Sequence, residues 1–220
     1  MRAQYNNPSV FSLAVTTNVI PLTMDLKLKI ILNNTDEVFI TSDNPVIRYN
    51  QFLEKRKPFG SNVGFAVKGL ELMLPISPKM FALFYDSSGY KVGHKKDDLV
   101  VTDNPTDIRA LNVLSCANGY KNVYFNHDIS QPVIRDIYAK AKNYRNQYKA
   151  TADRYDSVGD KIDSLIHVYS KDVKTNLQLS FISEQKRAKK YELGDQVVHV
   201  RNQAWVDEAD RLWALRHGES

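Results

Sequence analysis

Two segments of this chain place a carboxylate at the end of an apolar run, where an acid or base could act. Residues 39–46 read FITSDNPV and residues 99–106 read LVVTDNPT, so Asp43 and Asp103 each precede an Asn-Pro pair. His127 follows a third apolar run. Carboxylates and imidazoles are the usual groups of general acid–base catalysis. Asp43, with Asp103 or His127 assisting, would therefore form the catalytic group of a hydrolase or nuclease if folding brought them together.

Local structure also accounts for both segments. A residue before proline is biased towards extended geometry, and Asp and Asn side chains accept hydrogen bonds from nearby backbone N–H groups. Asn104 is expected to cap a helix that has Pro105 in its first turn, so Asp103 would end a strand. Asp43 is expected to lie at a corner between two strands. For Asp43, the catalytic and the structural interpretations both stay open.

The sequence contains no standard motif for a metal, a nucleotide or an activated nucleophile. The five histidines lack the spacing of a zinc protease, the glycines form no phosphate-binding loop, and Ser42 lacks the glycines that surround an esterase nucleophile. The single cysteine, Cys116, lies near the end of a predicted helix and is expected to pack as a small apolar residue. We predict no metal site and no cofactor, and the residues do not decide whether the protein is an enzyme.

A basic face is predicted on the helix that should begin near Ser130 and run to about Ser157. Its proposed phosphate contacts are Arg135, Lys142, Arg145 and Lys149. Tyrosines lie among these cations, and aromatic rings beside cations can hold single-stranded nucleic acid. The same tyrosines fit the buried side of an amphipathic helix, which would leave the cations simply solvated. A second basic segment, QKRAKK at residues 185–190, has the same two interpretations.

The elements that must position these residues change character along the chain. Alternating, β-branched and aromatic segments predict six strands: 26–32, 37–41, 46–49, 70–76, 80–85 and 99–102. Helical spacing predicts the helix after Asn104, the helix after Ser130, a helical segment at 162–169 and a last helix carrying Trp205 and Trp213. This is an α+β pattern, with a mostly antiparallel sheet in the N-terminal half and a helical C-terminal half packed on it. We expect a β-rich core over residues 1–130 and a helical portion over 131–220, joined as one continuous domain.

Composition narrows the class of protein. The chain has 220 residues, 43% of them hydrophobic, and a net charge of +5, which permits nucleic-acid binding without requiring it. No apolar run reaches the length of a membrane span, and the first residues lack the pattern of an export signal. We therefore expect a soluble cytoplasmic protein with no membrane partner.

Several of these segments together resemble a bacterial family, domain of unknown function 4238. The resemblance rests on FITSDNPV at 39–46, PISP at 75–78, Leu111-Asn112 and Val123-Tyr124, and it covers roughly residues 38–125. Members of that family usually begin with a His-containing segment and a helical region, which this chain lacks, so the resemblance is partial. The family name implies no reaction.

The leading functional hypothesis is a binding, interaction or regulatory module, because no motif demands a reaction. Its partner would be another protein chain or nucleic acid, and a small-molecule ligand stays unspecified. The Trp205 and Trp213 helix could serve as a docking surface. The alternatives are an enzyme centred on Asp43 and nucleic-acid binding through the basic helix.

Overall fold

A computed structural model describes most of the chain. The described residues are 7, 9, 13, 16–17, 19–56, 62–145, 151–156, 164–169, 172–192 and 199–218. For 151–156, 164–169 and 216–217 the description covers the backbone only.

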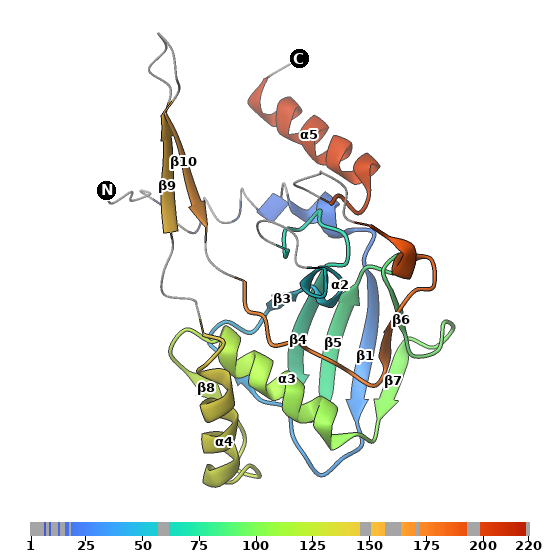
Figure 1. Ribbon diagram of the computed structural model, residues 1–220, viewed down its shortest axis with the longest axis vertical. Helices are drawn as coiled ribbons and strands as arrows, with labels where there is room; N and C mark the ends of the chain where they lie inside the picture. Colours follow the sequence, from blue (N-terminus) through green and yellow to red (C-terminus); the bar gives the residue numbers. More distant parts are fainter. Residues whose placement is uncertain are drawn as a thin grey trace.

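The main sheet has five strands in the order β3-β4-β5-β1-β7 (Figure 1). They are β1 (Lys27–Asn33), β3 (Ile47–Tyr49), β4 (Glu71–Ser77), β5 (Met80–Tyr85) and β7 (Leu99–Thr102). Neighbouring strands pair antiparallel except β7, which joins β1 in parallel. The sheet is therefore mixed, with antiparallel pairs in the majority, and the prediction of an α+β fold with its sheet in the N-terminal half is confirmed.

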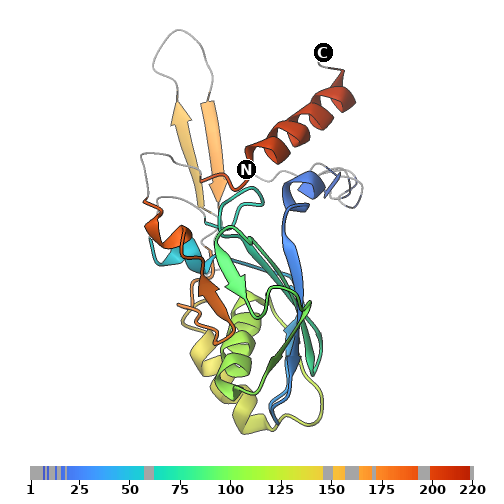
Figure 2. The same ribbon diagram turned by 90° about the vertical axis from the view of Figure 1, so that its right-hand side faces the viewer.

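Helix α3 (Pro105–Asn118) covers one face of the sheet, which we call the inner face (Figure 2). The helix starts as predicted, because the Asn104 side chain accepts a hydrogen bond from Thr106 N at 3.0 Å. Its apolar side then buries Ile108 and Leu111 in the core. The periodicity of this segment was sufficient to predict both the helix and the side that packs.

The predicted strand at 37–41 is wrong in extent. Only its last residue belongs to a strand, β2 (Thr41–Ser42), which pairs with β8 (Val123–Tyr124). The preceding backbone is bound by a side chain instead: Asn112 of α3 donates to Val38 O at 2.8 Å and accepts from Ile40 N at 3.0 Å. An amide side chain can satisfy both a backbone donor and a backbone acceptor, so this apolar run is buried without a neighbouring strand.

The C-terminal half is only partly helical, which corrects the prediction for it. Helix α4 (Gln131–Ala141) begins where expected but does not continue to Ser157. The antiparallel strands β9 (Thr151–Asp156) and β10 (Ser164–Tyr169) stand where helix was predicted. Apolar residues in segments of six residues fit both periods, and the β-branched residues of β10 favour the strand. The last helix, α5 (Gln203–His217), agrees with the prediction.

The remaining elements are short. They are the 3-10 helices η1 (Ile20–Thr23) and η2 (Ala188–Lys190), helix α2 (Gln51–Glu54), and the strands β6 (Tyr90–Val92) and β11 (Ile182–Glu184), which pair with each other.

The segment before β11 packs into the same core as the sheet. Leu177 and Leu179 belong to the core cluster. Ser180 donates from its backbone to the buried Asp107 carboxylate of α3 at 2.9 Å and from its hydroxyl at 2.5 Å. This charge-assisted pair anchors the returning chain to the start of α3 and so carries the QKRAKK segment back to the sheet.

One carboxyl group of the main sheet is completely buried. Glu71 of β4 accepts from the Gln51 side chain at 2.8 Å and from Gln51 N at 3.2 Å. Burial raises the pKa of Glu71 to about 7, against the opposing effect of hydrogen bonds from Gln51 and Tyr90. The folded protein therefore holds a proton on Glu71 at pH values at which the unfolded chain has lost it.

This protonation makes stability fall with rising pH. Between the ordinary pKa of 4.5 and about 7, the native state binds more protons at Glu71 than the unfolded state does. Relative to Glu71→Gln, the wild type should lose about 3 kcal/mol of unfolding free energy across this window. Urea unfolding at several pH values measures the difference. The matched control is Glu192→Gln, because Glu192 is exposed. A wild-type minus Glu71→Gln difference that does not change with pH would contradict the expectation.

Candidate functional site

The Asp43 carboxylate binds the turn that follows α3. Its Oδ1 accepts from Tyr120 N at 2.7 Å, and its Oδ2 accepts from Lys121 N at 2.9 Å and Asn122 N at 3.1 Å. In return, Asp43 N donates to Asn122 O at 3.1 Å. Both oxygens thus serve the backbone of one turn, and the corner between β2 and β3 is tied to the C-terminal end of α3.

These bonds set the ionisation of Asp43. Desolvation raises its pKa, but the N–H donors of Lys121, Asn122 and Tyr120 together outweigh it, so the pKa lies below the ordinary value of 3.8. A carboxylate with a lowered pKa and both oxygens occupied is a poor general base near neutral pH. The geometry supports the structural interpretation of Asp43.

The neighbours of Asp43 strengthen the same contact. The Asn44 side chain donates to Asn118 O at 3.2 Å, and the Asn118 side chain donates to Asn44 O at 2.7 Å. A Cβ on Gly119 would lie 2.8 Å from the Cβ of Ser42, so the two segments touch closely enough to require glycine there. Residues 42–44 therefore hold the end of α3 and the turn after it, and we call this contact with residues 118–122 the clasp.

Asp103 lies at the other end of the same helix. Asp103 comes two residues before α3 begins. Its Oδ1 accepts a hydrogen bond from the Asn34 side chain at 2.5 Å. The 14 residues of α3 span about 20 Å, so the structure does not bring Asp43 and Asp103 together. His127 has a side chain 96% exposed, and its Nε2 lies 3.2 Å from Asp128 Oδ1. None of the hydrogen bonds and ion pairs among the described residues joins the three predicted catalytic residues.

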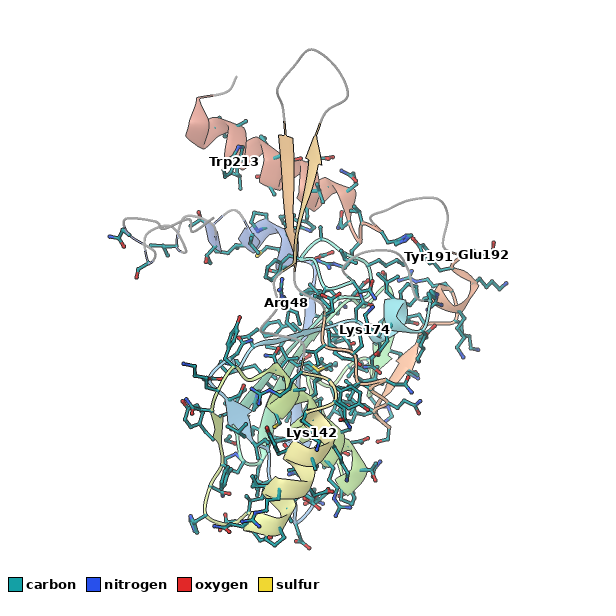
Figure 3. The ribbon with its side chains drawn as sticks, turned by 60° about the vertical axis from the view of Figure 1, so that its left-hand side comes forward. Arg48, Lys142, Lys174, Tyr191, Glu192 and Trp213 are labelled. Atoms are coloured by element: carbon teal, nitrogen blue, oxygen red, sulfur yellow. The ribbon has the colours of Figure 1, made fainter. Side chains whose placement is uncertain are left out.

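The four cations predicted to form a basic helix face do not form one surface in the described structure. Arg135 and Lys142 are exposed on and just after α4. The Arg145 guanidinium turns back to the clasp, where Nη2 donates to Gly119 O at 2.7 Å and Tyr120 O at 2.6 Å. Lys149 lies outside the described residues. Figure 3 shows that Lys142 and the C-terminal basic segment, near Tyr191, belong to different parts of the molecule.

A basic pocket lies where β1 begins, at a place the sequence did not suggest. Its volume is about 770 Å³. We call it the basic pocket and define it by these lining residues: Lys27, Leu28, Lys29, Ile30, Tyr85, Ser87, Lys91, Val92, Gly93, Lys95, Asp98, Gln185 and Arg187. The set contains five cations and one carboxylate. The pocket therefore has the charge balance of a site for an anion.

Strand pairing explains why a pocket forms there. β5 pairs with β1 from Lys27 onward, but β7 joins β1 only from Ile30, so the first residues of β1 have a free edge. The loop at 93–98 closes over that edge. The buried Lys29 ammonium holds this loop, because it donates to His94 O at 3.2 Å and to Asp97 O, and it lies 3.8 Å from Asp98 Oδ1.

Gly93 lets the loop turn at the end of β6. Its φ is +51°, and a Cβ there would lie 2.6 Å from Val100 Cγ2. A larger residue would be strained in this backbone conformation and would also meet β7. The β6–β11 pair then brings Gln185 and Arg187 to the opposite wall.

The cations of the basic pocket divide into two kinds. Lys29 is buried and satisfied by the loop, so it serves the structure. Lys27, Lys91, Lys95 and Arg187 are exposed, and none of them has an ion-pair partner among the described residues. Sequence reasoning noticed only the 185–190 part of this group. The lysines of β1 and β6 gave no signal, because alternating Lys is ordinary on a strand.

A second, smaller pocket of about 290 Å³ lies where the family-like segments meet. It is lined by parts of 39–41, 75–78 and 124–126. Apolar and aromatic side chains form most of its wall, so it presents no group for catalysis.

No three His, Cys, Asp or Glu side chains within the described part of the chain are grouped so that they could hold a metal ion. None of the helices described is both long and apolar enough to cross a bilayer.

The fold is that of an α+β protein whose surface carries the basic pocket beside the sheet. Over residues 3–128 the chain matches the family described as Protein of unknown function (DUF4238), and it belongs to that family. The match covers more than half of the 220 residues, including the Asp43 clasp and most of the basic pocket. No curated protein and no solved structure matches the chain.

The clasp predicts a stability role for Asp43. In Asp43→Asn an NH₂ group replaces one oxygen and faces backbone donors, so the thermal midpoint should fall at neutral pH. The deficit should shrink in acid, because the stabilisation by Asp43 is present above pH 3.8 and is lost as pH falls through the lower folded pKa.

The matched control is Asp103→Asn, which perturbs one exposed hydrogen bond to Asn34 and should melt close to the wild type. Scanning calorimetry at pH 7 and in acid makes the comparison. Equal midpoints for wild type and Asp43→Asn at pH 7 would show that the clasp does not stabilise the fold.

Proposed function

We propose that this protein is a binding module that holds a small anion carrying two or more phosphate groups in the basic pocket. The observation that carries the proposal is the set of four exposed cations, Lys27, Lys91, Lys95 and Arg187, around one cavity. They come from three separate parts of the chain, and none of them has an ion-pair partner in the part of the chain that the structure describes.

The chemistry of the walls favours phosphate. Lysine ammonium groups act as point charges for phosphate oxygens, and arginine adds a planar set of donors that can bind two oxygens at once. A volume near 770 Å³ lies within the range of small-molecule sites. Several like charges around a cavity also repel one another, so a bound polyanion would relieve an unfavourable field.

The alternatives have less support. An enzyme centred on Asp43 would need a carboxylate free to react, whereas Asp43 binds three backbone N–H groups. A nucleic-acid site on α4 would lose Arg145, which donates to the clasp. We retain the expectation that the protein is bacterial and cytoplasmic, which agrees with its one cysteine, buried and unpaired.

The proposal predicts charge-dependent binding of phosphate compounds. Isothermal titration with inorganic tripolyphosphate and with a nucleoside triphosphate should show binding that weakens as salt increases. The double variant Lys91→Glu/Arg187→Glu should weaken it by about tenfold or more, since each lost charge contact contributes to affinity.

The matched control is Arg135→Glu/Lys142→Glu, which changes the net charge equally but lies on α4. It should bind like the wild type. Equal weakening in both double variants would mean that total charge, and not the basic pocket, determines binding. Absence of binding to both phosphate compounds at low salt would overturn the proposal.

A further inference from the structure

The second face of the main sheet, which we call the outer face, is apolar across β4, β5, β1 and β7. The register places these side chains on it together: Arg48, Leu72, Leu74, Met80, Ala82, Phe84, Leu28, Ile30, Leu32, Leu99 and Val101. Arg48 is the only charged residue among them. It lies on the edge strand β3, with its guanidinium 5.3 Å from the centre of the Phe65 ring.

No described helix covers this face. In Figure 2, α3 and α4 both lie on the inner side of the sheet. Exposure is greatest toward β7, where Leu99 is 55% accessible and Val101 58%, and Met80 is 39% accessible. Five others are half-buried by their neighbours: Ile30, Leu32, Leu72, Leu74 and Phe84. Ala82, at 4%, is covered only because it is small and has larger neighbours on β1 and β4.

A sheet face exposed to water normally carries polar side chains in alternation with the core. Here the strands read LELMLPI, MFALFY and LVV, with apolar residues at both parities. That pattern is typical of strands buried on both sides. The strands therefore have the sequence of a sheet covered on both sides, while the described residues cover it on one side.

We infer that a second copy of this chain covers the outer face, so that two sheets pack face to face about a two-fold axis. In such an isologous contact each residue near the axis meets the same region of its partner. A charge near the axis would face an equal charge, and the centre of the outer face, around Ala82 and Ile30, has none. Arg48 lies at the rim, where its charge keeps access to water.

The size of the face agrees with this occupant. Five strands at about 4.8 Å spacing give a width of about 24 Å, and six residues give a length of about 20 Å. The edge strands β3 and β7 are shorter, so the flat area is about 430 Å². Side-chain relief adds to it, which approaches the ~600–1,000 Å² that each partner buries in a standard interface. Sheets packed this way lie about 10 Å apart, a separation that leucine, isoleucine and phenylalanine side chains fill.

Sedimentation equilibrium and light scattering of the full chain test the inference. The wild type should be a dimer at concentrations of about 10–100 µM and dissociate on dilution. Val101→Lys and Met80→Lys, which lie in one row with Leu32 between them, should shift the protein to monomer. Neither residue lines the basic pocket, so phosphate binding should be unchanged.

The matched control is Val133→Lys, which makes the same replacement at a partly exposed position of α4 and should stay dimeric. Circular dichroism checks the fold of each variant. Where a lysine variant loses structure, Val101→Thr keeps the branched shape and should raise the dimer dissociation constant. A wild type that is monomeric at 100 µM, or a dimer that survives both folded lysine variants, would overturn the inference and point to a different protein as the occupant.

Discussion

The buried ammonium of Lys29 positions the loop that lies over the start of β1. A charge removed from water must be satisfied, and here backbone carbonyls of the 93–98 loop do so, with Asp98 nearby. That contact closes the loop over the free edge of β1 and forms one wall of the basic pocket. Side chains alternate along a strand, so the residues on either side of Lys29, namely Leu28 and Ile30, point to the outer face. One strand therefore contributes to the core, the pocket and the apolar face.

The Asp-Asn-Pro segments show how one short motif takes two structural roles. At the second copy, Asn104 caps α3 from the residue before it starts. At the first copy, Asp43 caps the turn after the same helix ends, from a distant part of the chain. Both copies thus supply acceptors to backbone N–H groups around α3, one at each end. In a sequence, a capping Asp at the end of a strand looks the same as a catalytic Asp. The reason is that the same polar side chain can bind an unsatisfied backbone N–H group or a substrate.

Prediction from the residues succeeded where the controlling contacts are local. The start of α3 follows from Asn104 and Pro105, and the sheet strands follow from alternation with turn residues between them. It failed where the partner is distant. Residues 38–40 lack a strand neighbour because Asn112, far along the chain, binds their backbone. The predicted catalytic group failed for the same reason, because the residues around Asp43 and Asp103 do not indicate that the two lie at opposite ends of α3. The failure at β9 and β10 has another reason, since these strands pair with each other and their short apolar pattern fits a helix as well as a strand.

The sequence by itself determined the α+β class, the position of the main sheet in the N-terminal half, the family and the presence of strands apolar at both parities. These depend on side-chain period, capping and turn chemistry within a few residues. Only the tertiary structure decided that Asp43 binds the end of α3, that lysines of β1 and β6 meet Arg187 around one pocket, and that one sheet face is left open. Each of these depends on which strands become neighbours, and strand pairing joins residues that are far apart along the chain.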